Sequence, residues 1–325
     1  MPFRARRDPE LQPDAIRAAH ARIHPAFTGS PQYPHEGLSR AAGLGVVLKV
    51  ESVNPIRAFK GRGTWLAIEG LAGEGRVAPD RPAVAASTGN FGQGLAFAAR
   101  AHGIPAVVFA DAGANPVKLD RIRSFGATVI QEGRDFDEAR AAAASYARAH
   151  GAELVTDGQD PRIAAGAATL ALEVTDAAAG GGVPLPTAAY VPLGNGALLV
   201  GVGAWLRHAA PGCRIIGVAA AEAPSMVLSW RAGEPVETPA AATYAEGIAC
   251  RVPVPEALDM MVGRVDELML VSEDQLHAAE AELVAATGIT VEGAAAASWA
   301  GLLADARRDG PALVILTGSN ARTAG

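Results

Sequence analysis

Residues 188–208 read AAYVPLGNGALLVGVGAWLRH, and this stretch contains a complete strand–loop–helix unit. Its first part, Ala188–Leu193, is a short continuous apolar run, which is typical of a strand buried on both faces. Gly194–Leu198 follows as a glycine-rich turn, and Leu198–His208 has the composition of a helix. A buried strand that leads into a helix through glycines predicts an α/β protein with a parallel sheet.

The same alternation extends along the chain in both directions. Further apolar runs that predict strands are Val46–Val50, Ala83–Ala86, Ala106–Ala110, Thr128–Gln131, Ile215–Ala219, Leu268–Val271 and Ala312–Leu316. Helical composition fills most intervals, as in Phe91–Ala101 and Asp135–His150, and Ser272–Gln275 fits a capping box for a helix that ends near Gly288. Open α/β sheets bind ligands at the carboxyl ends of their strands, so the glycine-rich loops there are candidate sites.

The composition excludes several classes of protein. The chain has 325 residues, of which 50% are hydrophobic and 19% charged, enough for about two domains with a sizeable core. A net charge of −6 disfavours a general nucleic-acid binder, which would normally be basic. The N-terminus has no apolar signal segment, and the uncharged stretch from Ala177 to Leu206 is broken by glycines and prolines. Two cysteines imply no disulfide framework, so we expect a cytoplasmic protein.

Lysine chemistry has few candidates, because Lys49, Lys60 and Lys118 are the three lysines of the sequence. Lys60 lies between Phe59 and Gly61. In such an apolar setting desolvation favours the neutral amine, which can form a Schiff base with an aldehyde cofactor. The alternative is an ordinary exposed lysine at the start of a helix.

Two loops predict anion sites at the start of helices. Ser87-Thr88-Gly89-Asn90 follows the strand Ala83–Ala86, and its backbone amides suit a carboxylate, with simple helix capping as the alternative. Gly194-Asn195-Gly196-Ala197-Leu198 follows the strand Ala188–Leu193 and suits a phosphate. A dinucleotide-binding Gly-x-Gly-x-x-Gly fingerprint would need a glycine at Leu199, so that motif is incomplete.

A fourth segment, Thr317-Gly318-Ser319-Asn320, follows the last predicted strand and offers a hydroxyl to a heteroaromatic nitrogen, although a plain turn is the alternative. The order and spacing of the four segments resemble the fold-type II pyridoxal-phosphate enzymes, and above all the threonine/serine dehydratase and serine racemase family. Further matching segments are Lys49-Val50-Glu51, Asn115–Lys118, Phe125–Ala127, Ile163–Gly166, Glu246–Ile248 and Val291–Gly293.

The resemblance implies pyridoxal 5'-phosphate as the cofactor. It also implies a tryptophan synthase beta-like architecture of two α/β domains with central, largely parallel sheets. The large cofactor-binding domain would comprise residues 1–80 and 156–325, and a small mobile domain residues 81–155. The implied partners are a small-molecule amino-acid substrate and a second copy of the chain in a homodimer, with no nucleic acid and no membrane.

Carried over position by position, Lys60 falls on the catalytic Schiff-base lysine, Asn90 on the asparagine at the cofactor's phenolic oxygen, and Thr317 on the residue at the pyridine nitrogen. The resemblance implies that the cofactor is bound by Phe59, Lys60, Asn90, Gly194, Asn195, Gly196, Ala197, Leu198 and Thr317. It implies that the substrate carboxylate is bound by Ser87, Thr88, Gly89 and Asn90. A neutral hydroxyl at Thr317 favours departure of a β-leaving group over transamination.

The implied reaction is α,β-elimination from a β-hydroxy-α-amino acid such as threonine, serine or an arylserine, which yields a 2-oxo acid and ammonia. Lys60 would remove the α-proton, and the cofactor phosphate or a nearby acid would protonate the leaving hydroxyl. An amino-acid racemase or a β-replacement enzyme of the same fold stays open, because Thr88 falls where serine racemases have a second base. A catalytically silent relative and a nicotinamide-binding enzyme are the alternatives from other classes.

Several positions depart from the family pattern. Ala58 replaces the usual serine before Phe-Lys, and Phe91 replaces the usual histidine after the asparagine. Asn195 and Ala197 replace two glycines of the phosphate loop. Ala219 stands where many members begin a metal-binding segment with a glutamate, so we expect no metal site. Ala58 and Phe91 indicate a more apolar pocket, which makes a bulkier substrate such as an arylserine an option beside threonine and serine.

Overall fold

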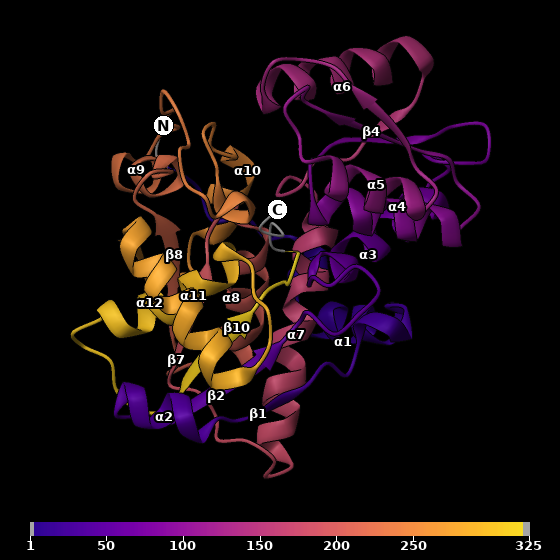
Figure 1. The fold of residues 1–325 in the computed structure, drawn as a ribbon. Helices are drawn as coiled ribbons and strands as arrows, with labels where there is room; N and C mark the ends of the chain where they lie inside the picture. Colours follow the sequence, from indigo (N-terminus) through magenta and orange to yellow (C-terminus); the bar gives the residue numbers. More distant parts are fainter. Residues whose placement is uncertain (1–2, 321–325) are drawn as a thin grey trace.

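The computed structural model describes residues 3–320 and divides into two lobes, each built around its own sheet (Figure 1). The larger lobe has a six-stranded sheet in the order β1-β2-β10-β7-β8-β9, in which β1 is antiparallel to β2 and the other neighbours are parallel. Its strands are β1 (Gln32–Pro34), β2 (Val46–Val50), β7 (Ala188–Pro192), β8 (Arg214–Ala220), β9 (Glu267–Val271) and β10 (Ala312–Leu316).

The smaller lobe has a four-stranded parallel sheet in the order β5-β4-β3-β6. Its strands are β3 (Ala83–Ala86), β4 (Ala106–Ala110), β5 (Thr128–Gln131) and β6 (Glu153–Leu154). All four lie between residues 81 and 155, although the domain boundaries themselves stay a prediction. The predicted α/β class with largely parallel sheets is confirmed.

Helices surround both sheets (Figure 1). They are α1 (Pro13–Arg22), α2 (Glu36–Ala42), α3 (Lys60–Gly73), α4 (Asn90–Ala101), α5 (Pro116–Ser124), α6 (Phe136–His150), α7 (Pro161–Ala179), α8 (Ala197–Ala209), α9 (Ser225–Ala232), α10 (Pro255–Met261), α11 (Glu273–Thr287) and α12 (Gly293–Ala304). Three short 3-10 helices are η1 (Pro9–Leu11), η2 (Pro25–Phe27) and η3 (Glu246–Ile248).

The central strand β10 shows how the core of the larger lobe is built. Leu313 and Ile315 belong to the apolar cluster formed with α7 and α8, whereas Val314 and Leu316 belong to the cluster formed with α11 and α12. Alternate side chains of a strand point to opposite faces of a sheet, so both faces of β10 are covered. This double burial explains why the strand sequence is apolar at every position.

The predicted strands agree with the structure to within one residue at each end. The capping box is also confirmed: Ser272 Oγ accepts from the Gln275 amide at 3.2 Å, and Gln275 Oε1 accepts from the Ser272 amide at 2.8 Å. Gly288 ends this helix in the left-handed region. Strands β1 and β6 were not predicted from the sequence.

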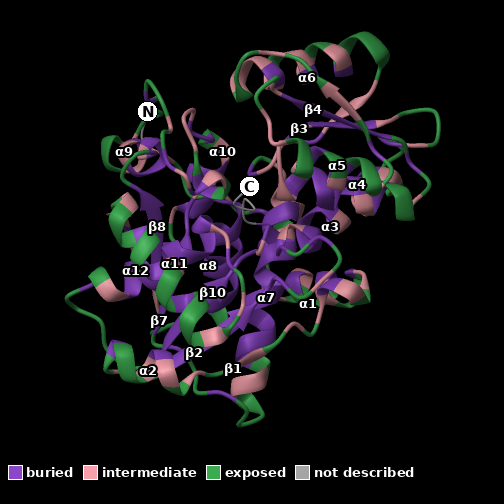
Figure 2. Ribbon diagram, in the orientation of Figure 1, coloured by how far each residue is buried: buried purple, intermediate pink, exposed green. Residues whose placement is uncertain are grey.

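Helix α7 packs closely against α3 and α8 near the first turns of both helices. A Cβ on Gly166 of α7 would lie 2.5 Å from Cα of Gly63 in α3, and a Cβ on Gly201 of α8 would overlap the carbonyl oxygen of Ala164. Figure 2 shows that α7 and α8 are buried over most of their length. Because α3 begins at Lys60 and α8 at Ala197, these contacts lie within about one turn of the two helix ends at which the sequence predicts a site.

Candidate active site

Lys60 occupies the first position of α3 and has a carboxylate partner. Its Nζ lies 2.5 Å from Oδ2 of Asp157, which belongs to the loop between β6 and α7. The two side chains are 13% and 14% exposed. The Phe59 ring centroid is 4.7 Å from Nζ. Lys60 is therefore not an exposed lysine. The expectation of a purely apolar setting is wrong, because the carboxylate of Asp157 contacts the amine.

The start of α3 is held by a buried network of charges. Arg62 is fully buried, and its guanidinium donates to Glu51 at 2.9 Å and to Glu173 at 2.8 and 2.9 Å. Lys49, also fully buried, donates to Glu173 at 2.5 Å. Two cations thus face two carboxylates, which satisfies charges that would otherwise be costly to bury. The network lies two residues beyond Lys60 and anchors its helix to β2 and α7.

The loop Gly194–Leu198 connects β7 to α8. Gly196 has φ +100°, a left-handed conformation that glycine adopts without strain. Gly194 is needed for packing, since a Cβ there would lie 2.8 Å from the carbonyl oxygen of Gly247. The Ala197 amide donates to Asn195 Oδ1 at 3.2 Å, so the asparagine side chain occupies one donor of the loop. The other first-turn amides and the helix dipole suit a phosphate.

The loop after β6 brings Lys60 and the Gly194–Leu198 loop together. Gly158 follows Asp157 directly, and a Cβ on Gly158 would lie 3.0 Å from the carbonyl oxygen of Asn195. The Lys60–Asp157 pair therefore lies beside the predicted phosphate loop, although the three segments are far apart in the sequence.

Thr317 follows β10 and lies next to the start of α3. Its carbonyl accepts from the Phe59 amide at 3.0 Å, and Ala58 forms a bridge with Gly318. The residue is 3% exposed, and its Oγ1 has no hydrogen-bond partner within residues 3–320. Buried hydroxyls are normally hydrogen-bonded, so an unpartnered one fits a ligand atom such as a ring nitrogen.

Asn90, the first residue of α4, joins the two lobes through hydrogen bonds. Its Nδ2 donates to Glu292 at 2.8 and 3.1 Å, and its Oδ1 accepts from Asn320 Nδ2 at 2.7 Å. Arg121 of α5 donates to Asn320 at 2.8 Å from the side of the smaller lobe. The segment Thr317–Asn320 is thereby held against both lobes.

Glu292 is a site residue that the sequence analysis did not identify. Burial raises the pKa of its carboxyl above the usual value, while the hydrogen bond from Asn90 and the charge of Lys118 act in the opposite direction. A Cβ on Gly318 would overlap Glu292 Oε1, so this glycine is needed for the close approach of the carboxylate. The segment Val291–Gly293 matches the family pattern, and this match is the sequence feature that points to Glu292. The neighbouring residues form no motif that would predict its role.

The side chain of Ser87 forms hydrogen bonds with the backbone at the loop Ser87–Asn90. Ser87 Oγ accepts from the amides of Gly89 at 3.2 Å and Gly92 at 2.9 Å. The alternative of helix capping therefore holds for the Ser87 hydroxyl. Binding of a carboxylate by Ser87, Thr88, Gly89 and Asn90 stays a prediction.

The two residues that favoured a bulky substrate are both in the core. Phe91 is 6% exposed and packs in the apolar cluster of the smaller lobe. Ala58 is fully buried beside η2 and α3. Both side chains pack in the core, so they give no support to the expectation of a more apolar pocket.

A cavity of about 650 Å³ lies beside the Asn90–Glu292 contact. Lys118 of α5 and Glu246 of η3 form an ion pair at its edge. The cavity is lined by Lys118, Tyr244, Glu246, Gly247, His277, Glu280, Ala281, Val284, Ala285, Glu292, Gly293, Ala294 and Asn320. Glu292 and Asn320 are the residues that this cavity shares with the contacts of Asn90.

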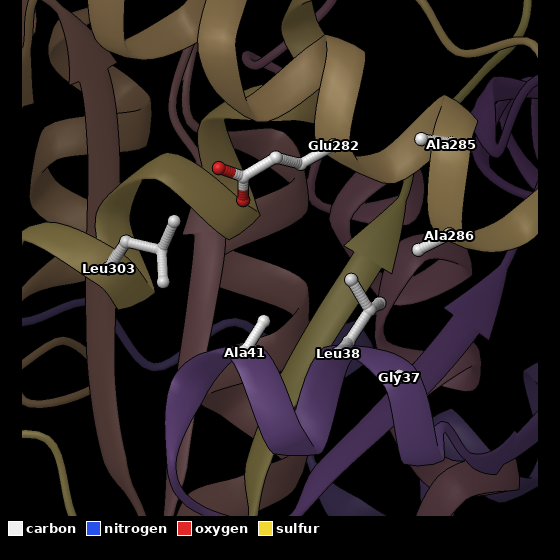
Figure 3. A pocket seen from close by; sticks show the side chains of 7 residues that line it. All are labelled: Gly37, Leu38, Ala41, Glu282, Ala285, Ala286 and Leu303. Carbon is white, nitrogen blue, oxygen red and sulfur yellow. The ribbon is translucent and has the colours of Figure 1, made fainter.

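A second pocket, of about 430 Å³, lies between α2, α11 and α12 (Figure 3). It is lined by Gly37, Leu38, Ala41, Glu282, Ala285, Ala286 and Leu303. The carboxylate of Glu282 already accepts from Trp299 Nε1 at 2.8 Å. The pocket includes none of the predicted site residues.

The gathered residues fit pyridoxal phosphate. Thr317 has an unpartnered buried hydroxyl, Lys60 is linked to the Gly194–Leu198 loop through its contact with Asp157, and the amide side chain of Asn90 is bound to the Thr317–Asn320 segment. β2, β7 and β10 all end at this edge, as expected for a ligand site of a parallel sheet. None of the helices in residues 3–320 has both the length and the continuous apolar sequence needed to span a bilayer.

Comparisons with known sequences point to one family. The family model described as "Pyridoxal-phosphate dependent enzyme" matches residues 23–318. An L-threonine ammonia-lyase of Geobacter sulfurreducens is 36% identical over 286 residues, which cover 87% of this chain and 69% of that protein. The mitochondrial threonine dehydratase of Saccharomyces cerevisiae is 31% identical, with 89% of this chain and 50% of that protein covered. The chain thus spans between half and about two thirds of these curated relatives.

Solved structures agree with the sequence comparison. A threonine deaminase from T.th. superposes with a TM-score of 0.88 and 28% identity, covering 97% of this chain and all of that one (100%). Maize serine racemase superposes with a TM-score of 0.87 at 23% identity, covering 96% of this chain and 94% of that one, and so shares the fold. The predicted fold type, the cofactor and the resemblance to threonine dehydratases are confirmed. The chain belongs to the pyridoxal-phosphate dependent enzyme family.

Proposed function

We propose that this chain is a lyase that catalyses α,β-elimination on a β-hydroxy-α-amino acid and releases a 2-oxo acid and ammonia. The observation that carries the proposal is the neutral hydroxyl of Thr317, buried without a partner in the described residues and tied through the Phe59 amide to the start of α3. A neutral group at the ring nitrogen leaves the cofactor a weaker electron sink, which favours loss of a β-substituent over transamination. The threonine ammonia-lyase and dehydratase relatives support the same reaction.

The residues of the site have distinct proposed roles. When bound, pyridoxal phosphate withdraws electrons from Cα of the amino acid. Lys60 holds the cofactor in the resting enzyme and accepts the Cα proton at its Nζ. The amides of Gly194–Leu198 would bind the phosphate, Asn90 would contact the phenolic oxygen, and Thr317 would contact the ring nitrogen. The amides of Ser87–Asn90 bind the substrate carboxylate.

Threonine and serine are the preferred substrates of this proposal. The relatives named for threonine support a small β-hydroxy amino acid. The option of an arylserine depended on Ala58 and Phe91, but both side chains are in the core. A small substrate therefore agrees better with the packing.

The test is 2-oxo acid release by the cofactor-saturated protein from L-threonine, L-serine and L-threo-phenylserine, with Lys60→Ala alongside. We expect release from threonine or serine, and a loss of at least about 100-fold in Lys60→Ala, since general-base catalysis contributes about 10²–10⁴-fold. If no oxo acid appears while amino acids still shift the cofactor absorbance, elimination is the wrong reaction. Formation of the D-enantiomer, followed by chiral chromatography, would then favour the racemase alternative.

We also propose that the chain acts as a homodimer in the cytoplasm, as the family resemblance implies. Light scattering of the purified protein measures the first part directly. A mass of two chains over a tenfold range of concentration would support the dimer, and a mass of one chain would refute it.

A further inference from the structure

The feature that the proposed roles leave unused is the carboxylate of Asp157. Its Oδ2 is 2.5 Å from Lys60 Nζ. Its Oδ1 is buried and has no hydrogen-bond partner within residues 3–320. We propose that Asp157 relays the proton that Lys60 removes from Cα to the oxygen that leaves Cβ. This inference rests on the proposed elimination reaction and names its missing acid.

The geometry of Asp157 suits a relay because the two oxygens differ. Oδ2 is engaged by the amine that takes up the proton, and no residue of the described chain occupies Oδ1, which leaves it for a second contact. The carboxylate is 14% exposed, so bulk water has little access to it. A buried carboxylate with an unused oxygen is costly unless a donor arrives, and the leaving hydroxyl of the substrate is such a donor.

The position of Asp157 between the two anchoring points of the cofactor supports the same role. Gly158, its neighbour, packs against Asn195 of the phosphate loop, while Asp157 itself contacts Lys60. Glu292, the other carboxylate of the site, accepts two hydrogen bonds from Asn90 instead. Of the two, Asp157 is therefore the acid in direct contact with the amine.

The proton balance of the step is closed. The Cα–H bond breaks and its proton goes to the neutral Lys60 Nζ, while its electron pair becomes the new Cα–Cβ double bond. The Lys60 ammonium passes a proton to the Asp157 carboxylate at Oδ2, the neutral carboxyl group turns about its Cβ–Cγ bond, and it donates that same proton to the β-oxygen. The Cβ–O bond breaks with its electron pair on oxygen, water leaves, and both side chains return to their starting charge.

The experiment that tests the relay compares two substrates that give the same product, pyruvate. L-Serine loses a hydroxyl that must be protonated, whereas β-chloro-L-alanine loses chloride, which needs no proton. We expect Asp157→Asn to lower kcat/KM for serine by about 100-fold or more, in the range of general acid catalysis. We expect elimination of chloride to change by less than about threefold.

Two controls separate chemistry from folding. Asp160→Asn, three residues along the same loop, keeps a residue able to cap α7 and should leave the ratio of the two substrates unchanged. Borohydride reduction followed by intact mass measurement should show the same cofactor adduct in Asp157→Asn as in the parent protein, because Lys60 is still present. The comparison of rates then refers to equally loaded proteins.

The outcomes distinguish this inference from the proposal beneath it. If Asp157→Asn lowers kcat/KM for serine and for β-chloro-L-alanine by the same factor, or abolishes the cofactor adduct, Asp157 positions Lys60 and the relay is refuted. If the parent protein eliminates chloride but releases nothing from serine or threonine, the proposed β-hydroxy substrate itself is refuted. If Asp157→Asn loses activity on serine but still eliminates chloride, the result supports both the relay and the proposed β-hydroxy substrate.

Discussion

The backbone amide of Phe59 donates to the backbone carbonyl of Thr317 over 3.0 Å, and this bond joins the start of α3 to the end of β10. Lys60 is the next residue after Phe59, so the amine proposed to hold the cofactor and the hydroxyl proposed to meet its ring nitrogen are positioned by one hydrogen bond. Both segments rest on buried supports, the central strand on one side and the Arg62 network on the other.

Thr317→Val tests the orphaned hydroxyl. The substitution removes a buried polar atom that has no partner in the described protein, so the cofactor-free variant should be at least as stable as the parent. Its affinity for pyridoxal phosphate should fall by roughly 2- to 13-fold, which corresponds to one hydrogen bond of about 0.5–1.5 kcal/mol. Urea unfolding measures the first effect and absorbance titration of the cofactor the second.

Thr317→Ser is the matched control, because it keeps the hydroxyl and removes a methyl group. We expect it to retain the cofactor affinity of the parent within about twofold while losing about 1 kcal/mol of stability from the smaller buried side chain. Equal cofactor affinity in Thr317→Val and the parent would show that the hydroxyl makes no contact with the ring.

Gly166→Ala tests the packing that positions Lys60. The new Cβ would lie 2.5 Å from Cα of Gly63, so α3 and α7 must move apart. Overpacking of this kind costs about 1–3 kcal/mol of unfolding free energy. Because α3 begins at Lys60, we also expect a fall in kcat. Gly73→Ala, at the other end of α3, meets no atom within 4 Å and should instead be neutral or stabilising by up to about 1 kcal/mol.

Arg62→Met tests the buried network. The variant removes the guanidinium that pairs with both Glu51 and Glu173, and breaking a buried ion pair on one side costs about 3–5 kcal/mol. The control is Arg134→Met, which removes an exposed partner of Glu138 and should leave the free energy of unfolding nearly unchanged, because water screens such a pair. Similar losses in the two variants, measured by chemical unfolding, would contradict a role for the network in holding α3.

Glu292→Gln tests a stability effect that depends on pH. The pKa of Glu292 is raised by burial, so the ionised form is disfavoured in the folded state. Its contribution to stability is complete below the unfolded value of about 4.3 and is lost as the pH rises through the folded pKa. Glutamine keeps an acceptor for Asn90 without the charge. We therefore expect Glu292→Gln to unfold at a higher temperature than the parent at about pH 8, with the difference vanishing near about pH 4.

Glu173→Gln is the control, because we expect it to change the pH dependence of stability in the opposite direction. Burial alone would raise the pKa of Glu173, but hydrogen bonds from His20 and Arg62 and the charges of Arg62 and Lys49 hold it below the usual value. Such a carboxylate stabilises the fold above the unfolded pKa of about 4.3 and loses this effect as the pH falls. Glu173→Gln should thus be destabilised at about pH 8, with a gap that narrows in acid. Stability curves of the same slope for the two variants would refute one of the two assignments, and the sign of the shared slope would identify it.

The larger elements of the fold could be predicted because their own residues mark where they begin and end. The buried strand Ala312–Leu316 is apolar at each position, and Ser272 and Gly288 delimit α11 by capping. The strands β1 (Gln32–Pro34) and β6 (Glu153–Leu154) are too short to show any alternation, so no pattern could indicate them. Their existence depends on the neighbouring strand, which is a tertiary effect.

The same distinction applies to the site. Lys60, Asn90 and Thr317 stand at the ends of predicted elements, where local sequence and the family pattern agree. Asp157 meets Lys60 across 97 residues of sequence, and Glu292 meets Asn90 across 202. Such contacts depend on how α7 and the two lobes pack, and no local motif predicts them. Phe91 illustrates the converse, since its place after Asn90 predicts exposure to the pocket but its ring is in the core.

The scarcity of lysine has a practical consequence for chemical labelling. The side chain of Lys49 is 0% exposed, and those of Lys60 and Lys118 are each 13% exposed. An acylating reagent that decorates the whole surface of most proteins would therefore find its lysine targets at the mouth of the active site. Bound cofactor should protect Lys60 from acylation. The extent of acylation at Lys60 would therefore report the fraction of protein molecules that lack pyridoxal phosphate.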